Sequence, residues 1–233
     1  MIKYLTHPLT IAILLAFNGG VVDTAGFLGL HGLFVAHVTG NFVTMGAAII
    51  GGGQGFIGKL AALPEFVLVV ALARLAGTGM RRLDWPAMRI LFVTNILLLI
   101  LFAGLAIWYG PFADGDTPIA LLTSAAGVAA MAMQTAVQRV HLADMPPSTM
   151  MTGSTVQATL DAVDLLTRAH PEQQAATSAR LRRLSSTIAA FACGCAISAV
   201  LFSYVGFWCL LLSVVVAICA TDLQSSRHLE ASR

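Results

Sequence analysis

The chain has 233 residues, of which 58% are hydrophobic and only 10% are charged, and its net charge is +2. About a quarter of the residues of soluble domains are charged, so this sequence has too few polar side chains to cover a water-exposed surface. The basic residues are dispersed among short segments. This distribution excludes a continuous basic surface for nucleic acid. The expected partner is the lipid bilayer.

Apolar stretches long enough to cross a bilayer, about 20 residues each, recur along the chain. In order they cover residues 11–33, 60–80, 90–109, 119–137 and 184–221. In the second stretch, Glu65 after Pro64 is expected to mark the start of a helix. The last stretch is about twice as long as one span, so we predict that it folds back near residues 204–206. The predicted fold is an all-α polytopic membrane protein, a single domain with about six transmembrane helices.

Two further apolar stretches, residues 37–53 and 149–166, are interrupted by polar residues and glycines. Each carries a Thr-Gly pair near its start, Thr39-Gly40 in the first and Thr152-Gly153 in the second. Two arrangements stay open. Both stretches enter the membrane and return on the same side, as re-entrant segments, or both cross it and give eight helices.

The distribution of basic residues favours re-entrant segments, because short cytoplasmic loops collect Lys and Arg. If the two stretches return, 12 of the 13 basic residues share one side with both termini, and only Lys59 lies opposite. If they cross, this bias largely disappears. We therefore expect the N- and C-termini in the cytoplasm, together with a short surface helix over residues 167–183.

The same order of elements, namely span, Thr-Gly stretch, span and span, occurs in residues 9–110 and again in residues 117–222. Three crossings per half would place the second half upside down relative to the first, which is an arrangement found in many transporters. An offset of 113 residues aligns the two Thr-Gly pairs and also Val43 with Val156. The prediction of an inverted repeat depends more on the order of elements than on these identities.

The segment from Asn18 through Asp23 to Leu30, followed by Phe34 to Asn41 with the first Thr-Gly pair, resembles the amino-terminal signature of the YoaK-like family (DUF1275). Residues 133–139 and the later Thr-Gly pair are similar to that family's second block. The resemblance implies a small integral protein of the bacterial cytoplasmic (inner) membrane. Since the family has no assigned biochemical function, it implies no substrate.

Asp23 falls near the middle of the first span, where an ionisable side chain is costly unless it faces a polar cavity or a partner. It either contacts a proton, ion or solute, or makes a structural hydrogen bond to a neighbouring helix. His37 is likewise either a titrating group or a structural hydrogen-bonding residue. Arg139 either anchors the topology at the cytoplasmic face or binds an anion.

The Thr-Gly pairs place a hydroxyl, a flexible backbone point and a further polar side chain in series. Irregular backbone at membrane depth is tolerated where it is buried in protein or lines a cavity, so we expect these segments to line a path. The alternative is that their glycines only allow close helix packing. The candidate path residues are Asn18, Asp23, His37, Thr39, Gly40, Asn41, Gln134, Arg139, Thr152, Gly153 and Ser154.

Three functions fit these features. The first is a transporter or channel for a small solute or ion, which needs no nucleotide-binding domain. The second is a membrane-embedded enzyme on a lipid-like substrate, with Asp23, His37 and Arg139 as acid, base and anion clamp. The third is a non-catalytic assembly factor that packs through the small residues of 125–132. No nucleotide loop, zinc motif or nucleophile elbow occurs, so we expect no catalytic residue, metal or cofactor. Assembly into a homo-oligomer stays open.

Overall fold

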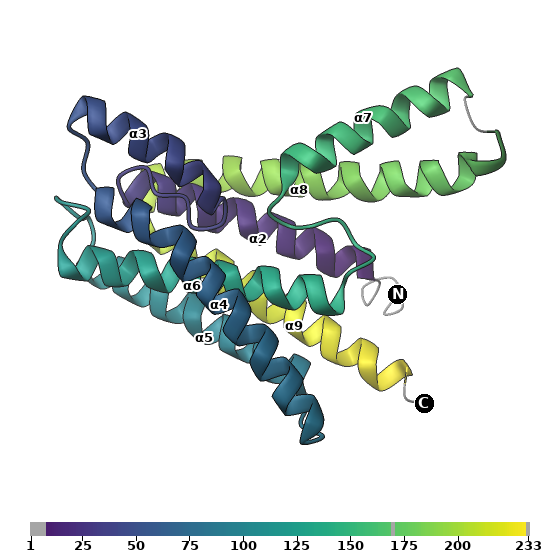
Figure 1. Cartoon of the computed structure of the whole chain (residues 1–233), viewed down its shortest axis with the longest axis horizontal. Coiled ribbons are helices and arrows are strands. Elements are labelled where there is room, and N and C mark those ends of the chain that lie inside the picture. Colours follow the sequence, from purple (N-terminus) through teal and green to yellow (C-terminus); the bar gives the residue numbers. More distant parts are fainter. Residues whose placement is uncertain (1–7, 169–170, 232–233) are drawn as a thin grey trace.

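The computed structural model describes residues 8–168 and 171–231, without the side chains of His141 and residues 226–231. These residues form helices, turns and loops and no strand, which confirms the predicted all-α class. The long helices lie side by side along one axis (Figure 1). In chain order the elements are α2 Pro8–Gly29, η1 Val38–Gly40, α3 Asn41–Gly51, α4 Phe56–Arg82, α5 Ala87–Tyr109, α6 Pro118–His141, α7 Met151–Thr167, η2 Pro171–Gln173, α8 Gln174–Val205, η3 Gly206–Cys209 and α9 Leu210–Ala231.

Five apolar segments of the described chain are long enough to span a membrane, namely α2, α4, α5, α6 and the stretch 171–225. The last segment is broken at Gly206, where a φ of +58° and a ψ of −140° let the chain reverse between α8 and α9. Glycine adopts this backbone conformation because it has no Cβ. The turn predicted near residues 204–206 is confirmed, while the exact number of membrane crossings stays a prediction.

Two predicted helix boundaries were wrong. The first helix ends at Gly29, before residue 33, because the chain turns at His31 and Gly32, whose φ angles are +54° and +79°. Pro64 lies inside α4, which already begins at Phe56. The Asp116 carboxylate accepts hydrogen bonds from the N–H groups of Phe56 and Ile57 at 3.1 and 2.9 Å. This cap comes from a distant loop and satisfies the free donors of the helix start.

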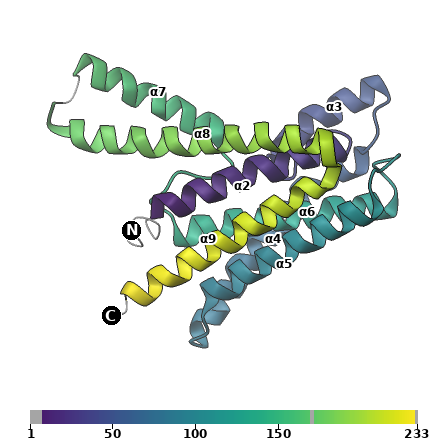
Figure 2. The same ribbon diagram turned by 180° about the vertical axis from the view of Figure 1, so that it is seen from behind.

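The two ends of the bundle differ in the number of basic residues that they carry. At one end, Ile11 of α2 packs with Leu142 after α6 and with Ala220 of α9. Figures 1 and 2 show the α4–α5 connection at this end and the tip of the α7–α8 hairpin beyond it. The basic residues of those connections therefore gather at one end, and Lys59 lies at the other. Lys3 and Arg233 lie outside the described residues.

After α2, the chain turns back along α2 towards the middle of the bundle. Val35 lies against Gly26, and the N–H of Ala36 reaches Asp23, so residues 30–37 run back over about 9 Å of helix length. The chain then leaves through α3, and Gly55 after α3 again lies beside His31. Residues 30–55 therefore start and finish at the same end of the bundle.

After α6, a second segment turns back in the same way. The Gln138 carboxamide accepts the N–H of Ser148 at 2.9 Å and donates to the carbonyl of Pro146 at 2.8 Å. The chain then continues into α7. Figures 1 and 2 show that α3 and α7 both begin near the middle of the bundle and run towards opposite ends. This is the order of elements expected for an inverted repeat, although the repeat itself stays a prediction.

The predicted surface helix over residues 167–183 was wrong. Only the short η2 follows α7, and residues 174–183 are the first turns of the 32-residue helix α8. The α7–α8 pair is fastened by Arg180, whose guanidinium contacts the Asp161 carboxylate at 2.6 and 2.8 Å. This ion pair holds the early turns of α8 against α7, so these residues belong to a helical hairpin and form no separate helix.

Residues 125–132 do not offer the helix-packing surface expected of an assembly factor. A Cβ on Gly127 would lie 3.0 Å from the Val35 side chain and 3.1 Å from the Phe102 ring. Ala130 and Ala132 are fully buried. The small residues of α6 therefore pack mainly within the chain itself.

Candidate functional site

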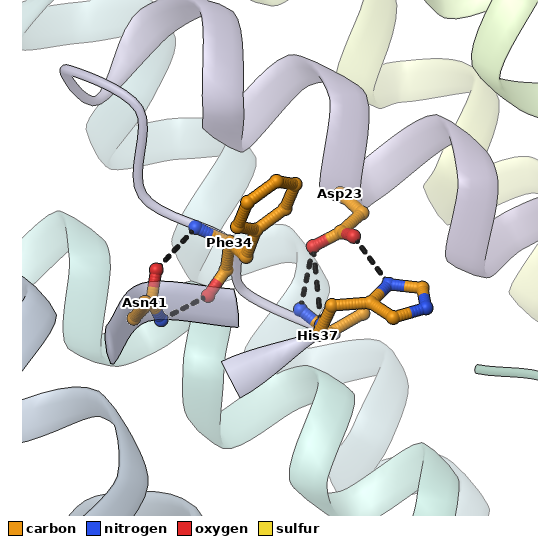
Figure 3. A network of polar contacts seen from close by, with 5 residues as sticks. Asp23, Phe34, His37 and Asn41 are labelled. Atoms are coloured by element: carbon orange, nitrogen blue, oxygen red, sulfur yellow. Dashed lines mark hydrogen bonds and ion pairs between the residues drawn. The ribbon is translucent and has the colours of Figure 1, made fainter. Parts of the chain in front are cut away.

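Asp23 fastens the first return segment to α2 (Figure 3). Its Oδ1 accepts the N–H groups of Ala36 at 2.8 Å and of His37 at 3.4 Å. Its Oδ2 lies 2.6 Å from His37 Nδ1, and the side chain is 6% exposed against 32% for His37. An ionised carboxylate only accepts, so Nδ1 carries the proton in this arrangement. Nε2 points away from Asp23 and has no hydrogen-bond partner in the described chain.

Asn41 closes the same segment where α3 begins. Its carboxamide accepts the N–H of Phe34 and donates to the carbonyl of Phe34, both at 2.8 Å, and Asn41 is buried. A Cβ on Gly40 would lie 3.0 Å from the Phe34 ring, so this glycine allows close packing. Thr39 is exposed beside them. The first Thr-Gly pair thus lies next to a backbone break that two buried polar side chains hold in place.

A groove of about 520 Å³ opens beside this pair. The return segment contributes Phe34 and His37, while α2 contributes Asp23 and Phe27 and α8 contributes Phe191. The ring centroids of Phe27 and Phe34 lie 4.8 Å apart, and those of His37 and Phe191 lie 5.3 Å apart. Since Phe27 is 39% exposed at its rim, the groove opens on the side of the bundle.

A second polar cluster holds the other return segment. Asn18 Nδ2 donates to Gln134 Oε1 at 2.7 Å, and Gln134 Nε2 donates to the carbonyl of Leu15 at 3.0 Å and lies 3.4 Å from Ser148 Oγ. These side chains are buried, and Asn18 Oδ1 has no partner in the described structure. A Cβ on Gly19 would lie 3.2 Å from the Ser148 carbonyl. Both return segments therefore contact α2 within residues 18–26.

The remaining candidates are not joined to the Asp23–His37 pair by any contact in the described part of the chain. Thr152 and Gly153 are exposed on α7, and a Cβ on Gly153 would meet only open space. Ser154 is buried and donates to the carbonyl of Met150 at 3.2 Å. Arg139 is exposed, with Nη2 3.1 Å from the sulfur of Met150. The second Thr-Gly pair therefore lies on the exposed face of α7, away from the other helices.

Sequence reasoning missed Gln138, Ser148 and Phe191. Gln138 follows Gln134 by one helical turn, so two buried amides share one face of α6, and this spacing was a usable signal. Ser148 lies in a loop, and Phe191 is one apolar residue within a long apolar run, so no local pattern singles them out. Among the side chains that the structure describes, no group of three or more His, Cys, Asp or Glu is placed to hold a metal ion.

Apolar helices of membrane-spanning length, with polar backbone breaks held inside the bundle, define a polytopic membrane protein. The sequence matches the family described as "Protein of unknown function (DUF1275)" over residues 11–222, and the chain belongs to that family. It is similar to the UPF0700 transmembrane protein YoaK of Bacillus subtilis (strain 168), with 31% identity over 147 residues. This match covers 62% of the chain and 63% of that relative, less than two thirds of its length. No solved structure matches the chain.

Proposed function

We propose that this protein is a small transporter or channel of the bacterial cytoplasmic membrane whose working centre lies at the two return segments. The observation that carries the proposal is that the backbone leaves helical geometry twice inside the bundle, and that buried side chains of α2 and α6 bind it there. In lipid, such backbone persists only where protein buries it or where it lines a cavity. Transporters commonly bind substrates at discontinuous segments of this kind.

The proposed orientation follows from charge. The end that carries the α4–α5 connection, Arg139 and the start of α8 faces the cytoplasm, because short cytoplasmic loops collect Lys and Arg. The end with Lys59 and Asp116 faces outward. In this orientation α3 and α7 are re-entrant helices that enter from opposite sides, and the two halves of the chain form an inverted repeat.

The Asp23–His37 pair gives the centre polar atoms that face the groove. Nδ1 is engaged by Asp23, while the free Nε2 belongs to a side chain that is 32% exposed and lines the groove. A solute in the groove would therefore meet a ring nitrogen that is available for a hydrogen bond.

Flux across liposomes tests the proposal. Purified protein is reconstituted with an entrapped pH-sensitive dye and challenged with a panel of small solutes and ions. We expect at least one solute to move protons or ions with the wild type, and a loss of this activity of about tenfold or more in Asp23→Asn. Exposed Asp144→Asn is the matched control and should keep full activity. Absence of flux for every solute, with protein that is folded and inserted, argues against a transporter.

A membrane-embedded enzyme is the second candidate, and the hydrogen-bonded Asp–His pair with a free Nε2 favours it. However, the guanidinium of Arg139, the expected anion clamp, is exposed and lies 3.1 Å from the sulfur of Met150, and no hydrogen bond in the described structure joins it to Asp23 or His37. Chemical analysis of the solute after the flux experiment separates the two functions. An enzyme converts its substrate, whereas a transporter leaves it unchanged.

A further inference from the structure

The groove beside Asp23 combines a nearly buried carboxylate with aromatic walls. We propose that it binds organic cations that carry an apolar body, such as protonated or quaternary amines. This inference rests on the proposed function and names the substrate class of the same site.

The charge of the groove favours a cation. Asp23 is the only carboxylate among its lining residues, and no Lys or Arg lines it. The other titratable side chains that face it are His37 from the return segment and Cys195 from α8. With His37 neutral, the pair carries one negative charge at a place where water is scarce. A bound cation compensates that charge, and an anion would add to it.

The aromatic rings supply the second part of the site. Phe27, Phe34 and Phe191 come from three different segments and line one groove. The face of an aromatic ring attracts a cation, by up to about 2 kcal/mol when the pair is desolvated. The rings also offer dispersion contacts to the apolar body of the ligand. A hydrated inorganic ion would gain little from such walls.

The position of the groove indicates how the ligand arrives. Its rim includes Leu28, which is 48% exposed, and the exposed Ala199 of α8. Both residues lie in or next to the apolar spans, so the groove opens towards the hydrocarbon of the bilayer. A cation with an apolar body concentrates in the membrane and can reach the groove from the side.

Equilibrium dialysis of the purified full chain with tetraphenylphosphonium tests the site. Tetraphenylborate has a closely similar shape and the opposite charge, so it measures partition into detergent and apolar surface. We expect saturable binding of the phosphonium and several-fold weaker binding of the borate. Equal binding of the two ions would overturn the proposal.

Three variants locate the binding. Asp23→Asn keeps an oxygen that can accept from Ala36 and removes the charge, so affinity should fall about tenfold or more. Phe191→Leu should weaken binding by about threefold to tenfold. Phe42→Leu is the control, because Phe42 is 50% exposed on α3 and does not line the groove. Unchanged affinity in Asp23→Asn, or equal losses in the two phenylalanine variants, would contradict the site.

The results also separate this inference from the proposed function. Phosphonium binding without its movement across liposomes upholds the cation site and argues against transport. Flux of another solute without phosphonium binding overturns the cation site and leaves transport standing.

Discussion

Asp161 is a fully buried carboxylate on α7, and Arg180 of α8 donates to both of its oxygens. Gln157, one turn earlier on α7, donates to Oδ1 at 2.8 Å. The hydrogen bonds from Arg180 hold the pKa of Asp161 below its usual range, and they outweigh the opposing effect of burial. A carboxylate with a lowered pKa stabilises the fold at every pH above its ordinary pKa of about 3.9. That stabilisation is lost as the pH falls through the lowered value.

Replacing Asp161 by Asn should therefore cost stability in a pH-dependent way. At neutral pH we expect a loss of about 1 to 3 kcal/mol, because charge-assisted hydrogen bonds to Arg180 are replaced by weaker ones. Thermal unfolding of the detergent-purified protein measures it. The gap in Tm between wild type and variant should persist down to about pH 4 and narrow below it. The control Asp144→Asn, at an exposed position, should have nearly the same Tm as the wild type. A Tm difference between wild type and Asp161→Asn that increases in acid would contradict the ion pair.

Among the elements, α2 and α8 cross with their backbones in close approach. A Cβ on Gly20 of α2 would overlap the carbonyl of Phe191, and a Cβ on Gly194 of α8 would overlap the carbonyl of Phe17. The Ser198 hydroxyl donates to the carbonyl of Val21 at 2.8 Å at the same crossing. Small residues allow the two backbones to come into contact. This contact fixes the position of the α8 residues that line the groove beside Asp23.

Gly194→Ala should separate these helices. The added methyl group meets backbone atoms, which cannot rotate away, so we expect a loss of stability of about 1 to 3 kcal/mol. Gly104→Ala is the matched control, because a Cβ there meets nothing within 4 Å in the middle of α5. It should be neutral or stabilising by up to about 1 kcal/mol. Similar melting temperatures for the two variants would show that the crossing is not tight.

At the scale of the whole molecule, the two return segments decide how the chain is threaded through the membrane. Residues 30–55 start and finish beside His31, and residues 142–167 run in and out from the opposite end (Figure 1). The sidedness of each connection is a prediction. It can be measured at the connections themselves.

Single cysteines at Gln54, Asp114 and Gln173, in a background without the native cysteines, test the threading with a membrane-impermeant thiol reagent. We expect Gln54→Cys and Asp114→Cys to label from outside intact cells, because both lie at the Lys59 end. Gln173→Cys should label only after the membrane is opened. Protection of Gln54→Cys in intact cells, with Gln173→Cys protected as well, would mean that α3 crosses fully, and it would contradict the inverted arrangement.

Much of the architecture could be predicted because it depends on local composition. The bend at Gly206 followed from an apolar run too long for one span, and the shared end of the basic loops followed from their charge. The start of α4 could not be predicted, because the cap that fixes it is Asp116, 60 residues away from Phe56. The pairing of Asp23 with His37 was open for the same reason, since the path of the chain between them was unknown.

Length and apolar composition were enough to identify a polytopic helical membrane protein, because they set whether a helix is more stable in lipid than in water. The position of Asp23 in the first span also indicated that this residue needs a partner. The identity of that partner depends on how the chain packs. Asn18 and Gln134 are 116 residues apart in the chain and 2.7 Å apart in space. Such contacts depend on how the helices pack, and packing joins residues that no local pattern connects.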